Sequence, residues 1–465
     1  MLGLKSFGTR RKVIALMIFA ALISLGVFFL WTPIATVYYS LESHQIFQTG
    51  AYDPDSPPFV VPQTQVPGRF SLDAAIDGRG TIHLVWMSTV VSPQFGRSAS
   101  IGPFYQRGER LGAEWSPPRP FPEDEALKPG NARSCPRVLA AGDTVAAFWT
   151  GEGGLVTKLS TDAGGSWAPE RFVLDGPLGS NYVLLRHGGN LYLVFGGSMG
   201  AHFAKSRDWG VNWTDPLPIG PPTARATSWP PVALAVVGET IHMVGEAADQ
   251  EVGGGLYAPQ FYHVLGAGLG ERWEEPHFIE LGTARPDSFQ PAVALRAIAL
   301  GQSLLVTYAS DRLLYVVTAD DGETWSAPRE LPAVPPVMQY DLCRQDDSTV
   351  EVFWVDLRNI ELQDIGKIPP GAGALLGFFG AKPRKNNDLF AATIRDSRAG
   401  PAVRLTPPDT YAEILFGALA CCPLKEGTLV IWGGKRDFGD YALSDSIKGE
   451  VFYRTISKSE DMIDE

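Results

Sequence analysis

The eight residues Ser160-Thr161-Asp162-Ala163-Gly164-Gly165-Ser166-Trp167 decide the fold of this chain. Their pattern, S-x-D-x-G-x-x-W, returns at Ser206–Trp213 and, with Thr in the first position, at Thr318–Trp325. Each copy follows a short apolar run and precedes a proline and a second such run. In a turn, the Asp carboxylate can accept backbone hydrogen bonds, Gly tolerates a positive φ, and Trp provides a large apolar face. The repeated stretch therefore predicts three β-hairpin turns of one kind.

A longer unit repeats around these turns. It consists of a Pro-containing lead-in, an apolar strand, a Gly/Asp turn, a strongly apolar second strand, a third strand, the quoted stretch and a fourth strand. The second strand is the clearest part, and it occurs at Ile82–Met87, Val145–Trp149, Leu191–Gly196, Ile241–Gly245, Leu304–Tyr308, Val350–Val355 and Leu429–Trp432. The copies are about 50 residues apart, the size of one propeller blade. Two degenerate stretches, Gly108–Trp115 and Gly266–Trp273, keep the final Trp.

The quoted stretch resembles the Asp box (BNR repeat) of the sialidase superfamily of β-propellers. The resemblance implies an all-β propeller, and seven second strands favour seven blades. Sialidases have six blades, so a six-bladed ring with one accessory hairpin is the alternative. We expect Phe59 to Pro62 to add an outer strand to the last blade and close the ring. Because the Asp box is a structural turn, it indicates a fold and not an activity.

The N-terminal region has the pattern of a membrane anchor. Val13 to Trp31 contains no charged residue, and the apolar character continues to Val37, which is long enough to span a bilayer as a helix. Four basic residues precede this stretch, so the positive-inside rule places the N-terminus in the cytoplasm and the rest outside. We expect a basic cytoplasmic segment at 1–12, a transmembrane anchor at 13–37 and a Pro-rich extracytoplasmic linker at 38–66. A cleaved signal peptide is the alternative.

The rest of the chain is predicted to be one propeller at 67–457, followed by an acidic tail at 458–465. An insertion at 357–388 combines an apolar, Gly-rich run with basic residues, so it is a candidate lid, membrane contact or protein-partner site, or a loop packed on its own blade. The net charge of −12 argues against a nucleic-acid partner.

The four cysteines are Cys135, Cys343, Cys421 and Cys422. In an exported domain they are either buried thiols or partners in a disulfide between neighbouring blades, from Cys343 to Cys421 or Cys422. No Cys/His spacing suggests a metal site, and we predict no metal and no cofactor.

Candidate ligand-binding residues lie in the lead-ins to the first strands. Arg133, Arg225 and Arg285 each follow an Ala in the lead-ins of units two, four and five. In a propeller these lead-ins share one face near the axis, opposite the Asp-box turns. Converging guanidinium groups would bind a carboxylate or sulfate through bidentate hydrogen bonds. Local pairing of each Arg with an acid or a carbonyl is the alternative.

The sialidase resemblance implies a triple-arginine clamp for the substrate carboxylate, a Tyr nucleophile activated by a Glu, and an acid/base carboxyl group. In this sequence Tyr340 enters the first strand of unit six, Glu246 ends the second strand of unit four, and Glu152 ends that of unit two. The family uses Asp where Glu152 stands, and the first repeat lacks its F-R-I-P-type motif. A strand-edge aromatic and two solvated acids are the alternative interpretation.

Three functional hypotheses follow. The first is a membrane-tethered extracytoplasmic propeller of the sialidase type that binds an acidic glycan or other carboxylate ligand and hydrolyses a glycosidic bond. The second is a non-catalytic binding or assembly platform at the membrane. The third is another glycoside hydrolase, which would show a carboxylate pair near the propeller axis.

Overall fold

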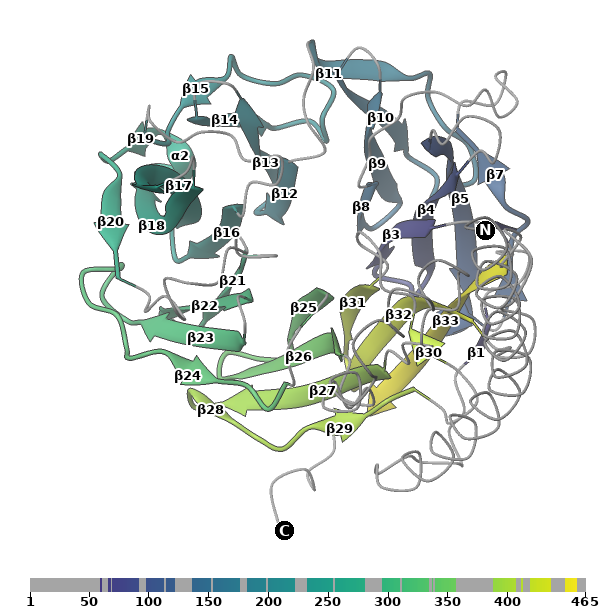
Figure 1. Cartoon of the computed structure of the whole chain (residues 1–465). Coiled ribbons are helices and arrows are strands. Elements are labelled where there is room, and N and C mark those ends of the chain that lie inside the picture. Colours follow the sequence, from purple (N-terminus) through teal and green to yellow (C-terminus); the bar gives the residue numbers. More distant parts are fainter. Residues whose placement is uncertain are drawn as a thin grey trace, which may run out of the picture. The chain divides into compact units, whose positions relative to one another are not determined.

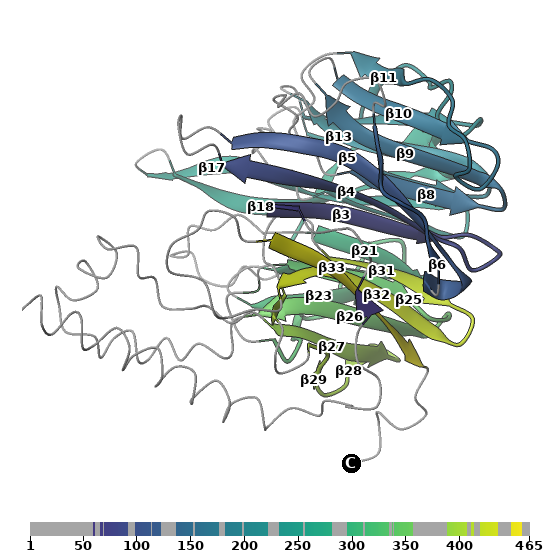
Figure 2. The ribbon, with the colours of Figure 1, turned by 90° about the vertical axis from the view of Figure 1, so that its right-hand side faces the viewer.

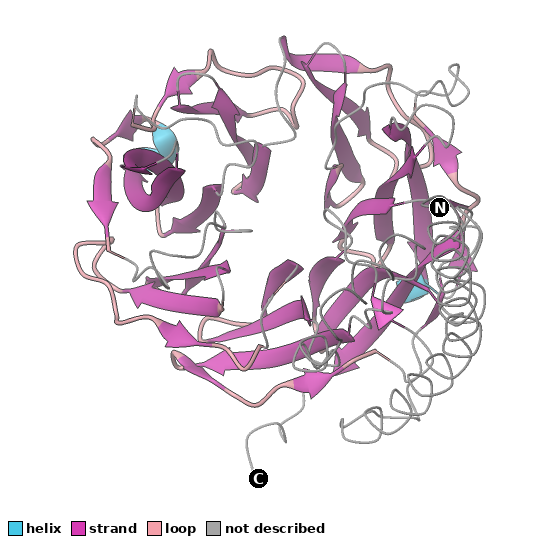
Figure 3. Ribbon diagram, in the orientation of Figure 1, coloured by secondary structure: helices cyan, strands magenta, loops and turns pink. Residues whose placement is uncertain are grey.

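The structure is a computed structural model that describes 59–60, 66–67, 69–91, 98–112, 114–121, 136–151, 154–175, 182–197, 200–221, 232–253, 256–280, 295–309, 312–333, 337, 339–356, 388–406, 411–412, 419–435 and 448–457. These residues form seven antiparallel β-sheets arranged in a ring (Figure 1). Figure 3 shows that strands make up most of this region. The prediction of an all-β propeller with seven blades is confirmed.

The first four blades follow one another along the chain. Blade one contains β3 (Arg69–Ile76), β4 (Ile82–Val91), β5 (Ser98–Glu109), η2 (Arg110–Gly112), β6 (Glu114–Trp115) and β7 (Arg119–Pro120). Blade two contains β8 (Arg137–Ala141), β9 (Thr144–Gly151), β10 (Gly154–Ser160) and β11 (Arg171–Asp175). Blade three contains β12 (Tyr182–His187), β13 (Asn190–Gly197), β14 (Gly200–Ser206) and β15 (Leu217–Pro218). Blade four contains β16 (Val232–Val237), β17 (Thr240–Gly253), β18 (Leu256–Gly266), α2 (Ala267–Gly270), β19 (Arg272–Trp273) and β20 (His277–Ile279).

The last three blades complete the ring. Blade five contains β21 (Leu295–Leu300), β22 (Ser303–Ala309), β23 (Leu313–Thr318) and β24 (Arg329–Glu330). Blade six contains β25 (Gln339–Arg344), β26 (Thr349–Asp356), β27 (Asp388–Arg395), β28 (Arg398–Ala399) and β29 (Val403–Arg404). Blade seven contains β30 (Tyr411–Ala412), β31 (Leu419–Leu424), β32 (Gly427–Lys435) and β33 (Lys448–Ser457), together with β1 (Phe59–Val60) and β2 (Val66–Pro67). All seven predicted second strands are confirmed, as β4, β9, β13, β17, β22, β26 and β32.

The ring is closed by strands from both ends of the described chain. Phe59 pairs with Tyr453 and Val60 with Phe452, so β1 is an outer strand of blade seven. This pairing confirms the predicted closing strand, which lies inside the segment that we assigned to the linker. Figure 2 shows the strands of the blades from the side of the ring.

The hydrophobic core lies between the blades. Seven separate clusters of buried apolar side chains each join two neighbouring blades, and together they go once around the ring. In the cluster that joins blades seven and one, for example, Leu72 and Trp86 pack with Leu429 and Tyr453. Each second strand contributes side chains to the interfaces on both sides of its blade, which explains why its sequence is almost continuously apolar.

The three repeated stretches form turns with the same hydrogen bonds. In the first turn, the Ser160 hydroxyl donates to Asp162 (2.7 Å) and accepts from the Gly164 N–H (2.8 Å), and Asp162 accepts from the Ser166 N–H (2.8 Å). Equivalent bonds are present at Ser206/Asp208/Gly210/Asn212 and Thr318/Asp320/Gly322/Thr324. These bonds hold the pKa of Asp162 below its usual range, with the Ser166 hydroxyl as the largest cause.

Two sets of predictions concern residues beyond the described part. The predicted span 13–37 and most of the insertion 357–388 lie outside the described residues. Within the described ranges, no helix is long and apolar enough to cross a bilayer.

Cys343, Cys421 and Cys422 are free thiols, so they form none of the disulfides considered, while Cys135 lies outside the described residues.

Candidate functional site

Four of the six predicted site residues lie outside the described residues, namely Arg133, Arg225, Arg285 and Glu152. The strands that follow the three arginines, β8, β16 and β21, are the innermost strands of blades two, four and five (Figure 1). The starts of these strands lie on the face of the ring opposite the repeated turns, because the strands of each blade alternate in direction.

Tyr340 is a core residue between blades five and six. Its ring is 1% exposed, and its hydroxyl donates a 2.7 Å hydrogen bond to the Thr307 carbonyl oxygen. The Arg296 guanidinium lies over the ring at 5.8 Å from its centroid. Burial raises the pKa of the Tyr340 hydroxyl, although Arg296 and the bond to Thr307 oppose the rise. This position and this pKa do not favour a nucleophile.

Glu246 lies on β17 in blade four, where it pairs in register with Phe261 and is half-buried. Tyr340 lies in blade six, so one blade separates the proposed nucleophile from its proposed base.

The inner strands carry a polar arc that our sequence analysis missed. It consists of Arg296 on β21, Asp341 on β25, Cys421 on β31, Asp73 on β3 and Arg137 on β8, from five consecutive blades. All five side chains are only partly exposed. We call these five residues the inner arc.

The two acids of the inner arc have equivalent roles. Asp73 accepts a 2.9 Å hydrogen bond from the Val138 N–H of the next blade, and Asp341 accepts one of 3.2 Å from the Cys421 N–H of the next blade. Arg137 lies 3.9 Å from Asp73, and Arg296 lies 3.4 Å from Asp341. Each acid therefore links its blade to the following one. Both acids lie three residues before the last residue of their strand. This shared position is the feature of the sequence that could have identified them as equivalent residues.

Asp73 has an unusual protonation equilibrium. Burial raises its pKa to about 6, against the opposing effects of Arg137 and the Val138 N–H, and the charge of Asp341 raises it further. A carboxyl group with a pKa near 6 keeps its proton to a higher pH than an ordinary Asp does, which is a property that general acids share. The same group would also make the contact between blades one and two sensitive to pH.

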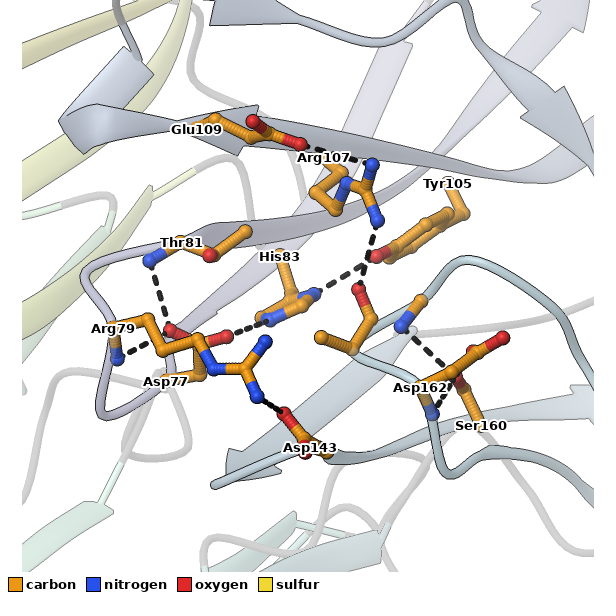
Figure 4. Close-up of polar contacts among 12 residues, drawn as sticks. Asp77, Arg79, Thr81, His83, Tyr105, Arg107, Glu109, Asp143, Ser160 and Asp162 are labelled. Atoms are coloured by element: carbon orange, nitrogen blue, oxygen red, sulfur yellow. Dashed lines mark hydrogen bonds and ion pairs between the residues drawn. The ribbon is translucent and has the colours of Figure 1, made fainter.

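On the face that carries the repeated turns, a chain of buried polar groups in blade one packs against blade two (Figure 4). Asp77 accepts hydrogen bonds from the Arg79 and Thr81 N–H groups at 2.8 and 2.9 Å, and it lies 3.4 Å from His83. His83 is also 2.8 Å from the Tyr105 hydroxyl. This order of acid, imidazole and hydroxyl resembles that of a catalytic relay, but His83 is 0% and Tyr105 2% exposed, so the three groups form a buried structural network. Tyr105 packs this network against Trp167 of blade two.

No group of three or more metal ligands occurs within the described part of the chain.

Among the comparisons with known proteins, only the one with solved structures finds proteins that are similar to this chain. No protein-family model and no curated protein sequence matches the chain. Similar structures include a protein of unknown function from Dyadobacter fermentans (14% identity, TM-score 0.45, covering 86% of this chain and 98% of that one). An α-L-arabinofuranosidase from Fusarium graminearum has 14% identity and a TM-score of 0.43, covering 74% and 99% of the two chains. The NanB sialidase from Streptococcus pneumoniae has 10% identity and a TM-score of 0.38, covering 86% and 70%. Similarities of this size carry no argument about activity.

Proposed function

We propose that the protein is a membrane-tethered, extracytoplasmic propeller of the sialidase-like type that binds an acidic glycan through Arg133, Arg225 and Arg285. The observation that supports this proposal is the closed ring, in which each of these arginines precedes an innermost strand. These three strands begin on the same face of the ring, and we expect their lead-ins to meet there. Guanidinium groups bind carboxylates through paired, charge-assisted hydrogen bonds. We also interpret the three repeated turns as Asp boxes on the other face, where they shape the fold and bind nothing.

Binding is tested with the full-length protein in detergent, using sialyllactose as the probe. We expect substitution of any one of Arg133, Arg225 or Arg285 by Ala to weaken binding by about 10-fold or more, the loss of one charged hydrogen-bonding group. Arg79→Ala, in a turn on the opposite face, is the matched control and should leave affinity unchanged. Equal binding by the three variants and the unchanged protein would refute the clamp.

Hydrolysis is the separate, catalytic half of the proposal. In it Tyr340 attacks the anomeric carbon, Glu246 takes the Tyr340 proton and Glu152 protonates the leaving oxygen. The buried hydroxyl of Tyr340 counts against this mechanism and favours the second candidate function, a non-catalytic binding or assembly platform, with the 357–388 insertion as the surface for a protein partner. Turnover of a fluorogenic sialoside that disappears in Tyr340→Phe would establish the sialidase mechanism, whereas binding without turnover would establish the platform.

The inner arc favours one further catalytic possibility, a glycoside hydrolase that uses Asp73 as the general acid. The support is its pKa of about 6 and the nearby charge of Asp341. Turnover of neutral aryl glycosides that is lost in Asp73→Asn but kept in Tyr340→Phe would select this mechanism.

A further inference from the structure

The junction between blades four and five contains three of the seven histidines of the chain. His242 on β17 is 1% exposed, and His263 on β18 is 0% exposed. His277, on the outer strand β20, is exposed. Figure 1 shows that blade four, which contains β18 and β20, is followed around the ring by blade five, which contains β23.

The three imidazoles form a chain and not a cluster. His242 Nδ1 lies 3.2 Å from His263 Nε2, and His263 Nδ1 lies 3.4 Å from His277 Nε2. Because His263 uses one nitrogen for each neighbour, the three rings cannot converge on a single metal ion. The rings of His242 and His263 are stacked, with centroids 5.3 Å apart and an angle of 19° between their planes.

The chain ends at a turn of blade five. His242 Nε2 lies 3.6 Å from Asp321 Oδ1, too far for a hydrogen bond, and this nitrogen is buried without a hydrogen-bond partner. Asp321 itself is 64% exposed in its side chain. His263 packs against Gly322 and the edge of Trp325 in the same turn. The groups that face the two buried rings are thus His277 from β20 and Asp321, Gly322 and Trp325 from blade five.

Three neutral rings satisfy this arrangement without burying a charge. A neutral imidazole has one N–H donor and one acceptor nitrogen, so three neutral rings can donate in one direction along the chain. A protonated His263 would have two donors, so both neighbouring rings would have to face it with an unprotonated nitrogen. With no solvent access, the new charge on His263 would also lack hydration.

We propose that the His242–His263–His277 chain is a proton-sensitive latch, which holds blades four and five together when it is neutral and loosens their junction in mild acid. The ligand would be the proton alone. The proposal is independent of what the opposite face of the ring binds.

Protonation equilibria agree with the geometry. Burial is the largest cause of a lowered pKa for His263, to about 3, and the charges of His242 and His277 lower it further. Burial also lowers the pKa of His242, while Asp321 opposes this effect. Near pH 6.5 the two histidines therefore bind protons in the unfolded chain but not in the folded junction. The contribution of His242 and His263 to the free energy of unfolding is therefore fully present above that pH and is lost as the pH falls.

Blade five supplies the matched variant. Leu305 and Tyr315 occupy the register positions in blade five that His242 and His263 occupy in blade four. The double variant His242→Leu/His263→Tyr therefore copies a pair that this fold already accommodates. The Tyr315 hydroxyl donates to the Ser397 carbonyl oxygen in a turn of the next blade, and we expect a tyrosine at position 263 to reach the turn at Gly322 in the same way.

The test measures unfolding of the full-length protein between pH 8 and pH 5. We expect the unfolding equilibrium constant of the unchanged protein, relative to the double variant, to rise by up to about tenfold per pH unit below pH 6.5 for each buried histidine. The same pH dependence in both proteins would overturn the proposal.

Hydrogen exchange of the unchanged protein gives a second, local measurement that does not require the variant to fold. After correction for intrinsic exchange rates, we expect β18 and the turn at 318–325 to lose protection at pH 5. We expect β27 and the turn at 395–398 to keep theirs, because the junction of blades five and six has Leu305 and Tyr315 in place of the two histidines. Equal acid sensitivity at the two junctions would also overturn the proposal.

Discussion

The junction between blades one and two and the junction between blades four and five have the same framework and differ in where a negative charge lies. His83 and Tyr105 occupy the register positions of His242 and His263. In the first junction the acid, Asp77, is buried with its histidine, whereas in the second the acid, Asp321, is mostly exposed. A protonated His83 would find acceptors in both Asp77 and Tyr105, but a protonated His263 would find two other imidazoles. Burial lowers the pKa of His83 as it does that of His263, but the hydrogen bond and charge of Asp77 oppose the change only at His83. Equivalent positions in a repeat protein can therefore differ in how strongly they resist protonation.

Both junctions require a glycine in the turn that packs against the preceding blade, and replacing this glycine should cause the largest loss of stability. Gly164 and Gly322 have φ values of 80° and 91°, and an added Cβ would overlap Tyr105 and His263, respectively. We expect Gly164→Ala and Gly322→Ala each to cost about 3 kcal/mol of stability, from the strained φ and the overlap together. Denaturant unfolding measures this cost.

Gly78→Ala is the control for these two variants. Gly78 has an ordinary φ, and its added Cβ would meet no atom within 4 Å. A cost as large as that at Gly164 would show that close packing of the turn against the preceding blade is not what requires glycine.

The buried acid gives the next largest effect. Asp77→Ala removes the acceptor for the N–H groups of Arg79 and Thr81 and leaves His83 without its carboxylate, which we expect to cost about 2 kcal/mol at pH 7. Although burial raises the pKa of Asp77, these bonds outweigh it and the pKa is lowered. The contribution is therefore present above pH 3.8 and should shrink below it.

Asp321→Ala is the matched variant at the other junction. Its side chain is mostly exposed and makes no hydrogen bond to His242 at 3.6 Å, so we expect a much smaller loss of stability. Equal losses at Asp77 and Asp321 would mean that burial of the acid does not distinguish the junctions.

Tyr105 stands at the first junction where His263 stands at the second, and its hydroxyl is the partner of His83. Tyr105→Phe removes the partner of His83 Nδ1 and keeps the ring packed against Phe121 and Trp167, so we expect a cost of about 1 kcal/mol. Thermal unfolding at pH 7 measures it. No loss would indicate that the His83 ring has another partner.

The surface ion pair should have the smallest effect. Arg79 pairs with Asp143 across the first junction, with side chains 65% and 50% exposed. Arg79→Ala should cost about 0.5 kcal/mol or less, and the difference should disappear in high salt. A cost that persists in 1 M salt would contradict a simple surface pair.

The fold was predictable because its signals are local and repeated. The hydrogen-bonding groups of each turn lie within a few residues of one another, and each second strand is an apolar run, so both can be identified in one sequence. The blade count followed from the same repetition. The pairing of β1 with β33 was predictable because the last repeat lacked an outer strand of its own.

The site was less predictable because its residues meet only in three dimensions. Tyr340 begins an inner strand, as predicted, but its orientation toward the core of blades five and six depends on packing that the sequence does not encode locally. The inner arc depends on contacts between consecutive blades, and its members look like isolated polar residues in otherwise apolar strands. Similarly, His242 and His263 are separated by 20 residues of one hairpin, and only strand pairing brings them together.

The mixed origin of blade seven has a consequence for synthesis of the protein. Phe59 and Val60 leave the ribosome early, but their hydrogen-bonding partners on β33 are among the last residues to be made. At typical elongation rates that interval is roughly half a minute or more. Until then the nascent blades form an open arc whose two end faces are both apolar, and they offer a natural binding surface for a chaperone.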